Sequence, residues 1–434
     1  MRYIVEATRG PTGLTRADGA GVVRHERAGR RGIGLCILTA VRTDRVTPGS
    51  QTSLREANRA RLVGAVQQRG SLTQVELAGI TGLSPASVSN IVKELVEAGV
   101  LSTAPSTRSG RRAQLVTLAR NLGLVAGVHI GTRSMRVALA DASLQVVGEQ
   151  RMPLAPDHRA DAGLERAAML VEEMIAAVDG SPGELLGVGI GVPAPVDVRT
   201  GEVSTAGLLR GWDGADVAAT LTDLLAVPVR VDNDANLGAL AEARHGAGAG
   251  HDPVAYVRVS HGVGGGIVLG GSLLHGRGGA AGEIGHVTID ENGPVCRCGN
   301  RGCLETFVGA PVLLHMLAAS HGHLTLRDVI MRARDGDAGS RRVLFDAGQH
   351  LGVAAANLCN IVDPEIVVIG GQLAEAGELL LGPLRTALEQ RTVPSVSGPP
   401  QVVASQFGAS AEVRGALAAA LDAARSAGAL GVGS

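Results

Sequence analysis

Between residues 54 and 101, apolar side chains recur at the three- and four-residue spacing of amphipathic helices. The stretch LREANRARLVGAVQQRG predicts a first helix. A second, short helix is predicted over 73–79, and a third begins with Ser84 as its N-cap and Pro85 at the first helical position. The turn between the last two contains Gly82. Two helices joined by a short glycine-containing turn are typical of a helix-turn-helix.

The last of these helices turns Val88, Ile91, Val92 and Leu95 inward and small polar side chains outward. Two strand-forming runs, 100–103 and 114–118, then flank a basic segment, which predicts a β-hairpin wing. Small polar residues suit base edges, and arginines suit phosphates. A purely structural three-helix appendage is the alternative. The candidate DNA contacts are Ser84, Ala86, Ser87, Ser89, Asn90 and Lys93 on the helix and Arg108, Arg111 and Arg112 on the wing.

From about residue 121 the pattern changes to short apolar runs of strand length, some of them separated by helical stretches such as LERAAMLVEEMIAAV. This alternation predicts a layered α/β domain. The runs GVHIG, GVGIGVP and VVIGG each end a predicted strand on glycine, which indicates two similar lobes around a cleft. We therefore divide the chain into residues 51–119, a winged helix-turn-helix, and 120–434, a two-lobed domain whose cleft lies near 233–305.

Charge and composition refine this division. Residues 1–50 and 51–120 each hold nine basic side chains against four acidic ones, although the whole chain has a net charge of -1. A basic front is typical of a polyanion-binding segment, and a solvated charged face is the alternative. Residues 1–50 lack a clear periodicity, and we therefore expect that they are disordered or that the start codon is placed too early. No apolar run spans a membrane and no secretory segment is visible, so we expect a cytoplasmic protein.

Three of the five cysteines fall within CRCGNRGCLE, ten residues after a histidine. The set His286, Cys296, Cys298 and Cys303 has the composition of a Cys3His zinc site. A disulfide does not fit a cytosolic chain, and a redox pair is more usually C-x-x-C. Four protein ligands leave no position for water, which predicts a structural Zn²⁺ ion rather than a catalytic one.

Acidic and amide side chains cluster around the same stretch. Glu283 and Glu305 flank the cysteines, and VDNDAN places Asn233 and Asp234 after a predicted strand. Together they suit a polyhydroxy ligand, although any one of them alone could be a helix cap or a surface acid. The run SHGVGGGIVLGG could cradle phosphates with its backbone N–H groups or form a tight hairpin.

EIGH followed, after a ten-residue step, by CRCGNRGCLE resembles the double signature of the ROK family of repressors and sugar kinases. VDNDAN, GVGGG and DPEIVVIGG resemble that family's other motifs and occur in the right order along the chain. The resemblance implies an α/β two-lobed actin-like/hexokinase-like (ribonuclease H-like) ATPase fold, here preceded by the winged helix-turn-helix of the repressor branch. It implies that Zn²⁺ binds the Cys3His set. It also implies that sugar hydroxyls contact Asn233, Asp234, Glu283, His286 and Glu305, with Asp234 as the catalytic base in the kinases.

One departure from the family separates two hypotheses. The kinases carry D-x-G-G-T near the start of the first lobe for ATP and Mg²⁺, whereas this chain has HIGTR over 129–133, with His129 in place of the aspartate. Imidazole is a poor Mg²⁺ ligand. We therefore expect a sugar-responsive transcriptional regulator that binds operator DNA as a homodimer or homotetramer and takes a sugar or sugar phosphate as effector. The alternatives are a glucokinase-like ATP-dependent kinase and a scaffold without ligand.

Overall fold

The computed structural model describes residues 51–108, 111–155, 158–197, 199–204, 211–212, 214–395 and 398–430. The prediction made for residues 1–50 lies outside this range. Residues Pro48–Ser434 form one compact unit. None of the helices in the described ranges is long and apolar enough to cross a membrane.

The first elements form a winged helix. They are α1 (Gln51–Arg69), β1 (Leu72–Thr73), α2 (Gln74–Thr81), α3 (Pro85–Glu97), β2 (Leu101–Arg108) and β3 (Arg111–Leu118), with the strands in the order β1-β3-β2. Thr73 and Glu76 form a reciprocal capping box at the start of α2, and Gly82 ends that helix in the left-handed conformation with φ 67°. Ser84 caps α3 as predicted. The two wing strands are longer than the runs predicted from their apolar residues.

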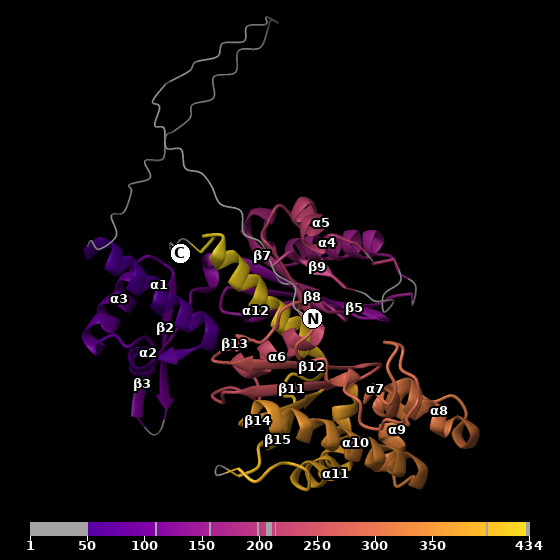
Figure 1. Ribbon diagram of the computed structural model, residues 1–434. Coiled ribbons are helices and arrows are strands. Elements are labelled where there is room, and N and C mark those ends of the chain that lie inside the picture. Colours follow the sequence, from indigo (N-terminus) through magenta and orange to yellow (C-terminus); the bar gives the residue numbers. More distant parts are fainter. Residues whose placement is uncertain are drawn as a thin grey trace, which may run out of the picture. The chain divides into compact units, whose positions relative to one another are not determined.

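The second part contains two five-stranded sheets with the same strand order (Figure 1). The first sheet has the strand order β10-β7-β4-β5-β6. The second sheet, read from its other edge, has the equivalent order β15-β14-β11-β12-β13. In each, three antiparallel strands come first in the chain and two parallel strands follow. The duplication confirms the two-lobed fold. The strands of the first sheet are β4 (Leu124–Ile130), β5 (Ser134–Asp141), β6 (Val146–Pro153), β7 (Leu185–Val192) and β10 (Val229–Asn233). Those of the second are β11 (Val254–Val259), β12 (Val263–Leu269), β13 (Ser272–Leu273), β14 (Ile366–Gly370) and β15 (Gln401–Ala404).

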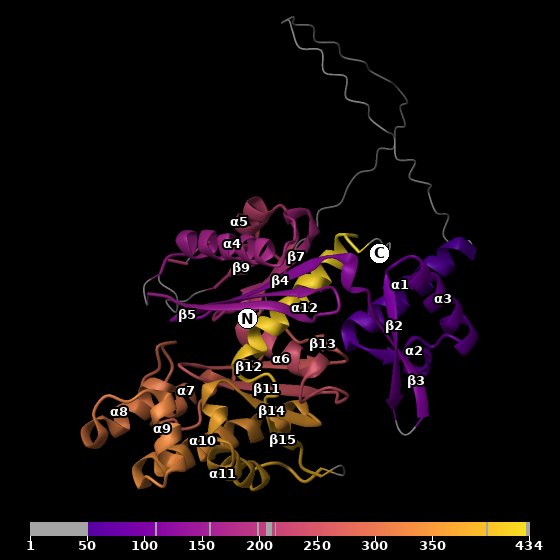
Figure 2. The same ribbon diagram turned by 180° about the vertical axis from the view of Figure 1, so that it is seen from behind.

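Two helices, α6 (Asp234–His245) and α12 (Ala411–Ser426), lie between the sheets (Figures 1 and 2). Glycines set this close packing. A Cβ atom on Gly189 of β7 would overlap the Ala416 carbonyl oxygen of α12, and one on Gly266 of β12 would lie 2.7 Å from the Ala239 Cβ of α6. Gly264, Gly265 and Gly266 of GVGGG therefore belong to a strand packed against a helix, and the predicted hairpin turn is confined to residues 260–262, which include Gly262.

Outer helices cover the other face of each sheet. The first lobe packs α4 (Ala160–Ala177) and α5 (Val217–Leu225) on its sheet. The second lobe packs a larger helical layer, consisting of α7 (Glu305–Val308), α8 (Ala310–His321), α9 (Leu326–Arg334), α10 (Ala338–Val362) and α11 (Glu378–Glu389). A small two-stranded sheet, β8 (Val196–Asp197) with β9 (Glu202–Val203), follows β7.

The winged helix and the first lobe share a buried apolar cluster. It joins side chains of α1 and α3 to Val125 of β4 and Leu417 of α12. The division at residues 119 and 120 stays a prediction, because this packing joins the two parts without a clear boundary between them.

Candidate functional site

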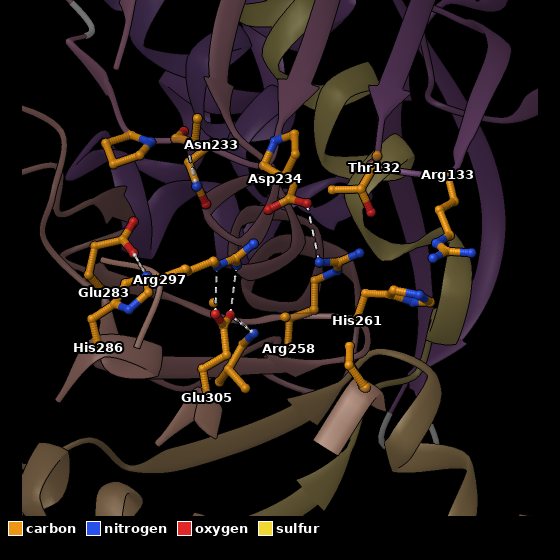
Figure 3. A pocket seen from close by; sticks show the side chains of 18 residues that line it. Thr132, Arg133, Asn233, Asp234, Arg258, His261, Glu283, His286, Arg297 and Glu305 are labelled. Carbon is orange, nitrogen blue, oxygen red and sulfur yellow. Dashed lines mark hydrogen bonds and ion pairs between the residues drawn. The ribbon is translucent and has the colours of Figure 1, made fainter. Parts of the chain in front are cut away.

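A cavity of about 300 Å³ opens at the carboxyl ends of β4, β7 and β10. Its walls are the residues that follow these strands, the 260–262 turn, and side chains from the cysteine-rich segment (Figure 3). Ligands of open α/β sheets bind at this edge of the strands. All the residues predicted to contact sugar line the cavity, namely Asn233, Asp234, Glu283, His286 and Glu305.

Asn233 is held by the backbone around it. Its Oδ1 atom accepts from the N–H groups of Ala235 and Asn236 at 2.8 and 3.2 Å, which caps α6, and its Nδ2 atom donates to the Ala194 carbonyl at 3.1 Å. The neighbouring Asp232 bonds to His275 at 2.7 Å and supports the same strand end. The side-chain amide of Asn233 is therefore already oriented without a ligand.

Asp234 lies in a buried charge network that the sequence analysis missed. Its Oδ2 atom is 3.3 Å from His129 Nε2 and 3.3 Å from Arg258 Nη1, and Arg258 Nε forms an ion pair with Glu412 Oε1 at 2.7 Å. Burial opposes the charged form of Asp234, but Arg258 and His129 outweigh it and hold the pKa of this carboxyl below its ordinary value. Asp234 is therefore a paired carboxylate.

Glu305 is fixed in a similar way at the other end of the cavity. Its carboxylate accepts from Arg297 Nη2 at 2.9 Å and from the Val263 N–H at 3.0 Å, and Arg297 Nε lies 2.7 Å from its Oε1 atom. Among the described side chains, no arginine forms an ion pair with Glu283, and the nearest basic group is His286 Nε2 at 4.0 Å. Burial, followed by the charges of Asp234 and Glu305, raises the pKa of Glu283.

The predicted metal ligands converge. One donor atom from each of His286, Cys296, Cys298 and Cys303 lies within 4.8 Å of all the others. The Cys298 and Cys303 sulfurs are 3.7 Å apart, and Cys296 Sγ lies 3.6 Å from His286 Nδ1. Zn–S bonds of about 2.3 Å and Zn–N bonds of about 2.0 Å at tetrahedral angles give separations of about 3.8 and 3.5 Å. The described donors thus fit one tetrahedral ion. His286 Nε2, on the other side of the ring, faces Glu283 at 4.0 Å.

The predicted DNA-contacting residues of α3 lie on its outer side, opposite a buried row that includes Val88 and Leu95. Ser84, Ala86, Ser89, Asn90 and Lys93 are exposed and Ser87 is half-buried. Ser84 Oγ also accepts from the Ser87 N–H at 3.1 Å, so this hydroxyl caps the helix. At the wing, Arg108 pairs with Arg111 in the hairpin register. The side chains of Arg108, Arg111 and Arg112 are not among the described ones.

Comparison with known proteins matches residues 125–423, more than half of the chain, to the ROK family. The chain belongs to the ROK family. A second match, over residues 56–112, is to the MarR family and covers the winged helix.

Among curated relatives of the ROK chain, the xylose repressor of Bacillus subtilis is 28% identical over 377 residues, covering 86% of this chain and 97% of that protein. The transcriptional dual regulator NagC of Escherichia coli is 29% identical over 368 residues, covering 80% and 90%. A solved structure of a ROK family transcriptional regulator, described as a homologue of the Escherichia coli MLC protein, superimposes with a TM-score of 0.71 at 25% identity, covering 86% of this chain and 96% of that one.

ROK proteins also include glucokinases. The xylose repressor and NagC each match 80% or more of this chain, which agrees with the expectation that the chain is more a regulator than an enzyme.

Two cavity features were not predicted from the sequence. Arg258 interrupts the apolar run VAYVRV, and this single charge in a buried strand is a signal that could have been found. Arg133 and His261, on the turns after β4 and β11, gave no such signal.

Helix α12 contacts both the cavity network and the winged helix of the ROK chain. Glu412, in its first turn, pairs with Arg258. Asp422, in its last turns, accepts from Gln67 Nε2 of α1 at 3.0 Å and from Arg244 Nη2 of α6 at 2.9 Å. One helix thus carries polar contacts from the cavity at one end to α1 at the other.

Proposed function

We propose that the chain is a sugar-responsive, DNA-binding transcriptional regulator that represses carbohydrate-metabolism genes. The winged helix binds operator DNA, with the exposed face of α3 in the major groove and the basic wing on the backbone. The active form is a homodimer or homotetramer, because a symmetric operator requires paired recognition helices. The names of the xylose repressor and NagC support this assignment.

The effector is a sugar or sugar phosphate bound in the cavity of about 300 Å³. Asn233, Asp234, Glu283, His286 and Glu305 present amide, carboxylate and imidazole groups to its hydroxyls. A carboxylate is an acceptor only, whereas a hydroxyl both donates and accepts, so a ring of acids with one imidazole suits a polyhydroxy ligand. The ligand changes DNA affinity only to the extent that it binds two arrangements of the protein with different affinity.

The observation that carries the proposal is the pairing of Asp234 with His129 and Arg258. A catalytic base has to take a proton from the attacked hydroxyl, and a carboxylate held by a buried guanidinium is weakly basic. Phosphoryl transfer also needs Mg²⁺ and positioned phosphates, and His129 replaces the oxygen ligand that this ion prefers. The cavity therefore retains groups for binding sugar, whereas its candidate base is paired with Arg258 and the Mg²⁺ ligand of the kinases is replaced by His129.

The second candidate is a glucokinase-like, ATP-dependent sugar kinase with Asp234 as its catalytic base. The retention of this carboxylate in the cavity is the specific observation that favours it. The two functions are not exclusive in one chain, so both are tested on the same protein preparation.

A structural Zn²⁺ ion would be held by His286, Cys296, Cys298 and Cys303, whose donor atoms fit a tetrahedral site. When bound, the ion supplies a fixed centre with no open ligand position. His286 would ligate through Nδ1 and keep Nε2 for the cavity, and the short segment after Cys303 positions Glu305. The metal thereby orients two ligand-binding side chains.

The deciding experiment is a gel shift of the full chain on the DNA upstream of its own gene, with and without a panel of pentoses, hexoses and their phosphates. We expect specific binding that weakens steeply with salt and is released by one member of the panel. Binding without salt dependence would refute the DNA assignment. Turnover of about 1–100 s⁻¹ with ATP, Mg²⁺ and a sugar would refute the regulator without kinase activity.

A further inference from the structure

A second cavity, of about 800 Å³, lies between the winged helix and the first lobe. Its walls come from α1, β2 and β3 on one side and from α6, α12 and the turn between β5 and β6 on the other. Both ribbon views show the winged helix beside α6 and α12 (Figures 1 and 2). This cavity is more than twice as large as the one proposed to bind sugar, and the two share no lining residue. The proposed regulator does not use it.

The inner wall and the outer edge of the second cavity differ in polarity. The inner wall contains buried apolar side chains, namely Val66, Leu118, Ala142, Ala241, Leu417 and Leu421. The edge carries exposed, uncharged hydroxyl and amide side chains, namely Ser71, Ser102, Thr103, Asn121 and Gln145. Sites for small organic molecules are of this size and have an apolar interior with a few polar groups. The second cavity therefore has the form of a ligand site.

The charges of the second cavity are basic, and no aspartate or glutamate is among its lining residues. Arg120 lies 3.7 Å from Asp141, which compensates its charge. Arg414 lies over the ring of Phe407 at 5.0 Å, and among the described residues it forms no ion pair. His245 adds no charge at neutral pH, because burial lowers its pKa to about 4. Arg414 is thus a cation in this cavity whose charge no described acid compensates.

Gln67 adds a hydrogen-bonding group to the apolar inner wall. The residue is only 2% exposed, and its Nε2 atom donates to Asp422 at 3.0 Å. Its Oε1 atom is buried and has no hydrogen-bond partner among the described residues. Buried polar atoms of folded proteins are nearly always paired. A ligand with an O–H or N–H group next to Gln67 would supply the missing partner.

We propose that the second cavity is a binding site for an amphipathic organic anion. The apolar body of the ligand, one or two rings in size, packs on the inner wall, and its anionic group binds to the guanidinium of Arg414 through paired N–H groups. The site is separate from the sugar cavity and does not rest on the sugar response. Because the ligand contacts the winged helix and the first lobe together, it favours the arrangement in which these two stay packed, and it changes DNA affinity to that extent.

The test uses two probes with the same rings: anilinonaphthalene sulfonate, which carries an anionic group, and phenylnaphthylamine, which lacks it. Equilibrium dialysis and fluorescence titration of the full-length, zinc-loaded protein measure the Kd and the stoichiometry of each probe. We expect one sulfonate molecule per chain, bound at least tenfold more tightly than the neutral amine. Inorganic sulfate, tested as a competitor, measures the contribution of the charge alone and should compete only weakly.

Four variants locate the site. Arg414→Gln should weaken the sulfonate by tenfold or more and leave the amine within twofold, and Arg414→Lys should recover part of the loss. Ser102→Trp places an indole at the exposed edge of the cavity and should remove the binding of both probes. Gln114→Trp is the matched control, because Gln114 is exposed on β3 and lies outside the cavity. Glu283→Gln, in the sugar cavity, should leave both Kd values within twofold.

Each part of the proposal has its own refuting result. Equal affinity for the two probes, or an equal loss of both in Arg414→Gln, would overturn the anionic class of the ligand. Unchanged binding in Ser102→Trp, or loss of binding in Glu283→Gln, would overturn the location, and binding of neither probe would overturn the site. A gel shift that is the same with and without saturating sulfonate would overturn the effect on DNA affinity. Failure of every sugar to release DNA would refute the sugar response and leave this site intact, because the two cavities share no residue.

Discussion

Replacing Arg258 with methionine should destabilise the larger domain strongly, because the substitution leaves two buried carboxylates without their shared cation. The side chains of Asp234 and Glu412 are only 4% and 3% exposed, and that of Arg258 is 19% exposed. Removing one partner of a buried ion pair costs about 3–5 kcal/mol. For a domain of this size each kcal/mol lowers the melting temperature by about 2 °C, which gives a decrease of about 6–10 °C.

The loss should depend on pH in a defined direction. In the wild-type chain the pKa of Asp234 is lowered on folding, so its contribution is present above the unfolded pKa of about 4 and is lost as the pH falls through the folded value. In Arg258→Met, burial is opposed only by His129 and the Ala235 N–H, and we expect the folded pKa of Asp234 to rise above the unfolded one. The free energy of unfolding of the variant then decreases as the pH rises from the unfolded pKa of Asp234 through its raised folded pKa. The difference from wild type should be largest near pH 8 and smaller near pH 5.

Differential scanning calorimetry from pH 5 to pH 8 measures both quantities. Arg342→Met is the control, because Arg342 forms an exposed pair with Asp346 one helical turn away, and losing such a pair costs about 0.3–0.5 kcal/mol. Adding Glu412→Gln to Arg258→Met should restore part of the stability by removing one buried charge. A decrease no larger than that of the control, or one that is the same at pH 5 and pH 8, would refute the buried network.

Two further predictions concern the metal site and α12. Cys298→Ser should lose bound zinc and the sugar response together while the winged helix stays folded, as measured by metal analysis, calorimetry and circular dichroism; retention of full sugar affinity after zinc loss would contradict the orienting role of the ion. Asp422→Ala removes the acceptor shared by Gln67 and Arg244. The Kd of this variant for sugar should be the same with and without operator DNA. The coupling between sugar binding and DNA binding is reciprocal, and it is lost together with the contact that transmits it.

The sequence predicts those features that depend on local pattern. The winged helix follows from helical spacing, from Ser84 and Pro85 at the start of α3, and from the left-handed Gly82. The strands predicted from GVHIG, GVGIGVP and VVIGG are present as β4, β7 and β14, because a buried strand with parallel neighbours is nearly all apolar. The Cys3His cluster is predictable because its cysteines lie within eight residues and its histidine is near.

Features that depend on the meeting of distant segments could not be predicted. β6, β13 and β15 were missed, since two are short and β6, on one edge of its sheet, mixes polar and apolar residues. The pairing of Asp234 with Arg258 and of Arg258 with Glu412 joins residues 24 and 154 positions apart. No local pattern specifies a contact over that separation, and it is this contact that distinguishes a paired carboxylate from a free base.

The position of α12 explains how ligand binding in the cavity could affect the winged helix. The helix lies between two sheets at glycine and alanine contacts, where Gly189 and Gly415 leave no room for a side chain. Tightly packed contacts of this kind transmit a shift with little deformation. Glu412 is tied through Arg258 to Asp234 in the cavity, and Asp422 is tied to Gln67 of α1. A ligand that competes for Asp234 weakens the ion pairs of Arg258 with Asp234 and Glu412. The free energy of sugar binding can therefore change the position of α12, the helix whose Asp422 is bonded to α1.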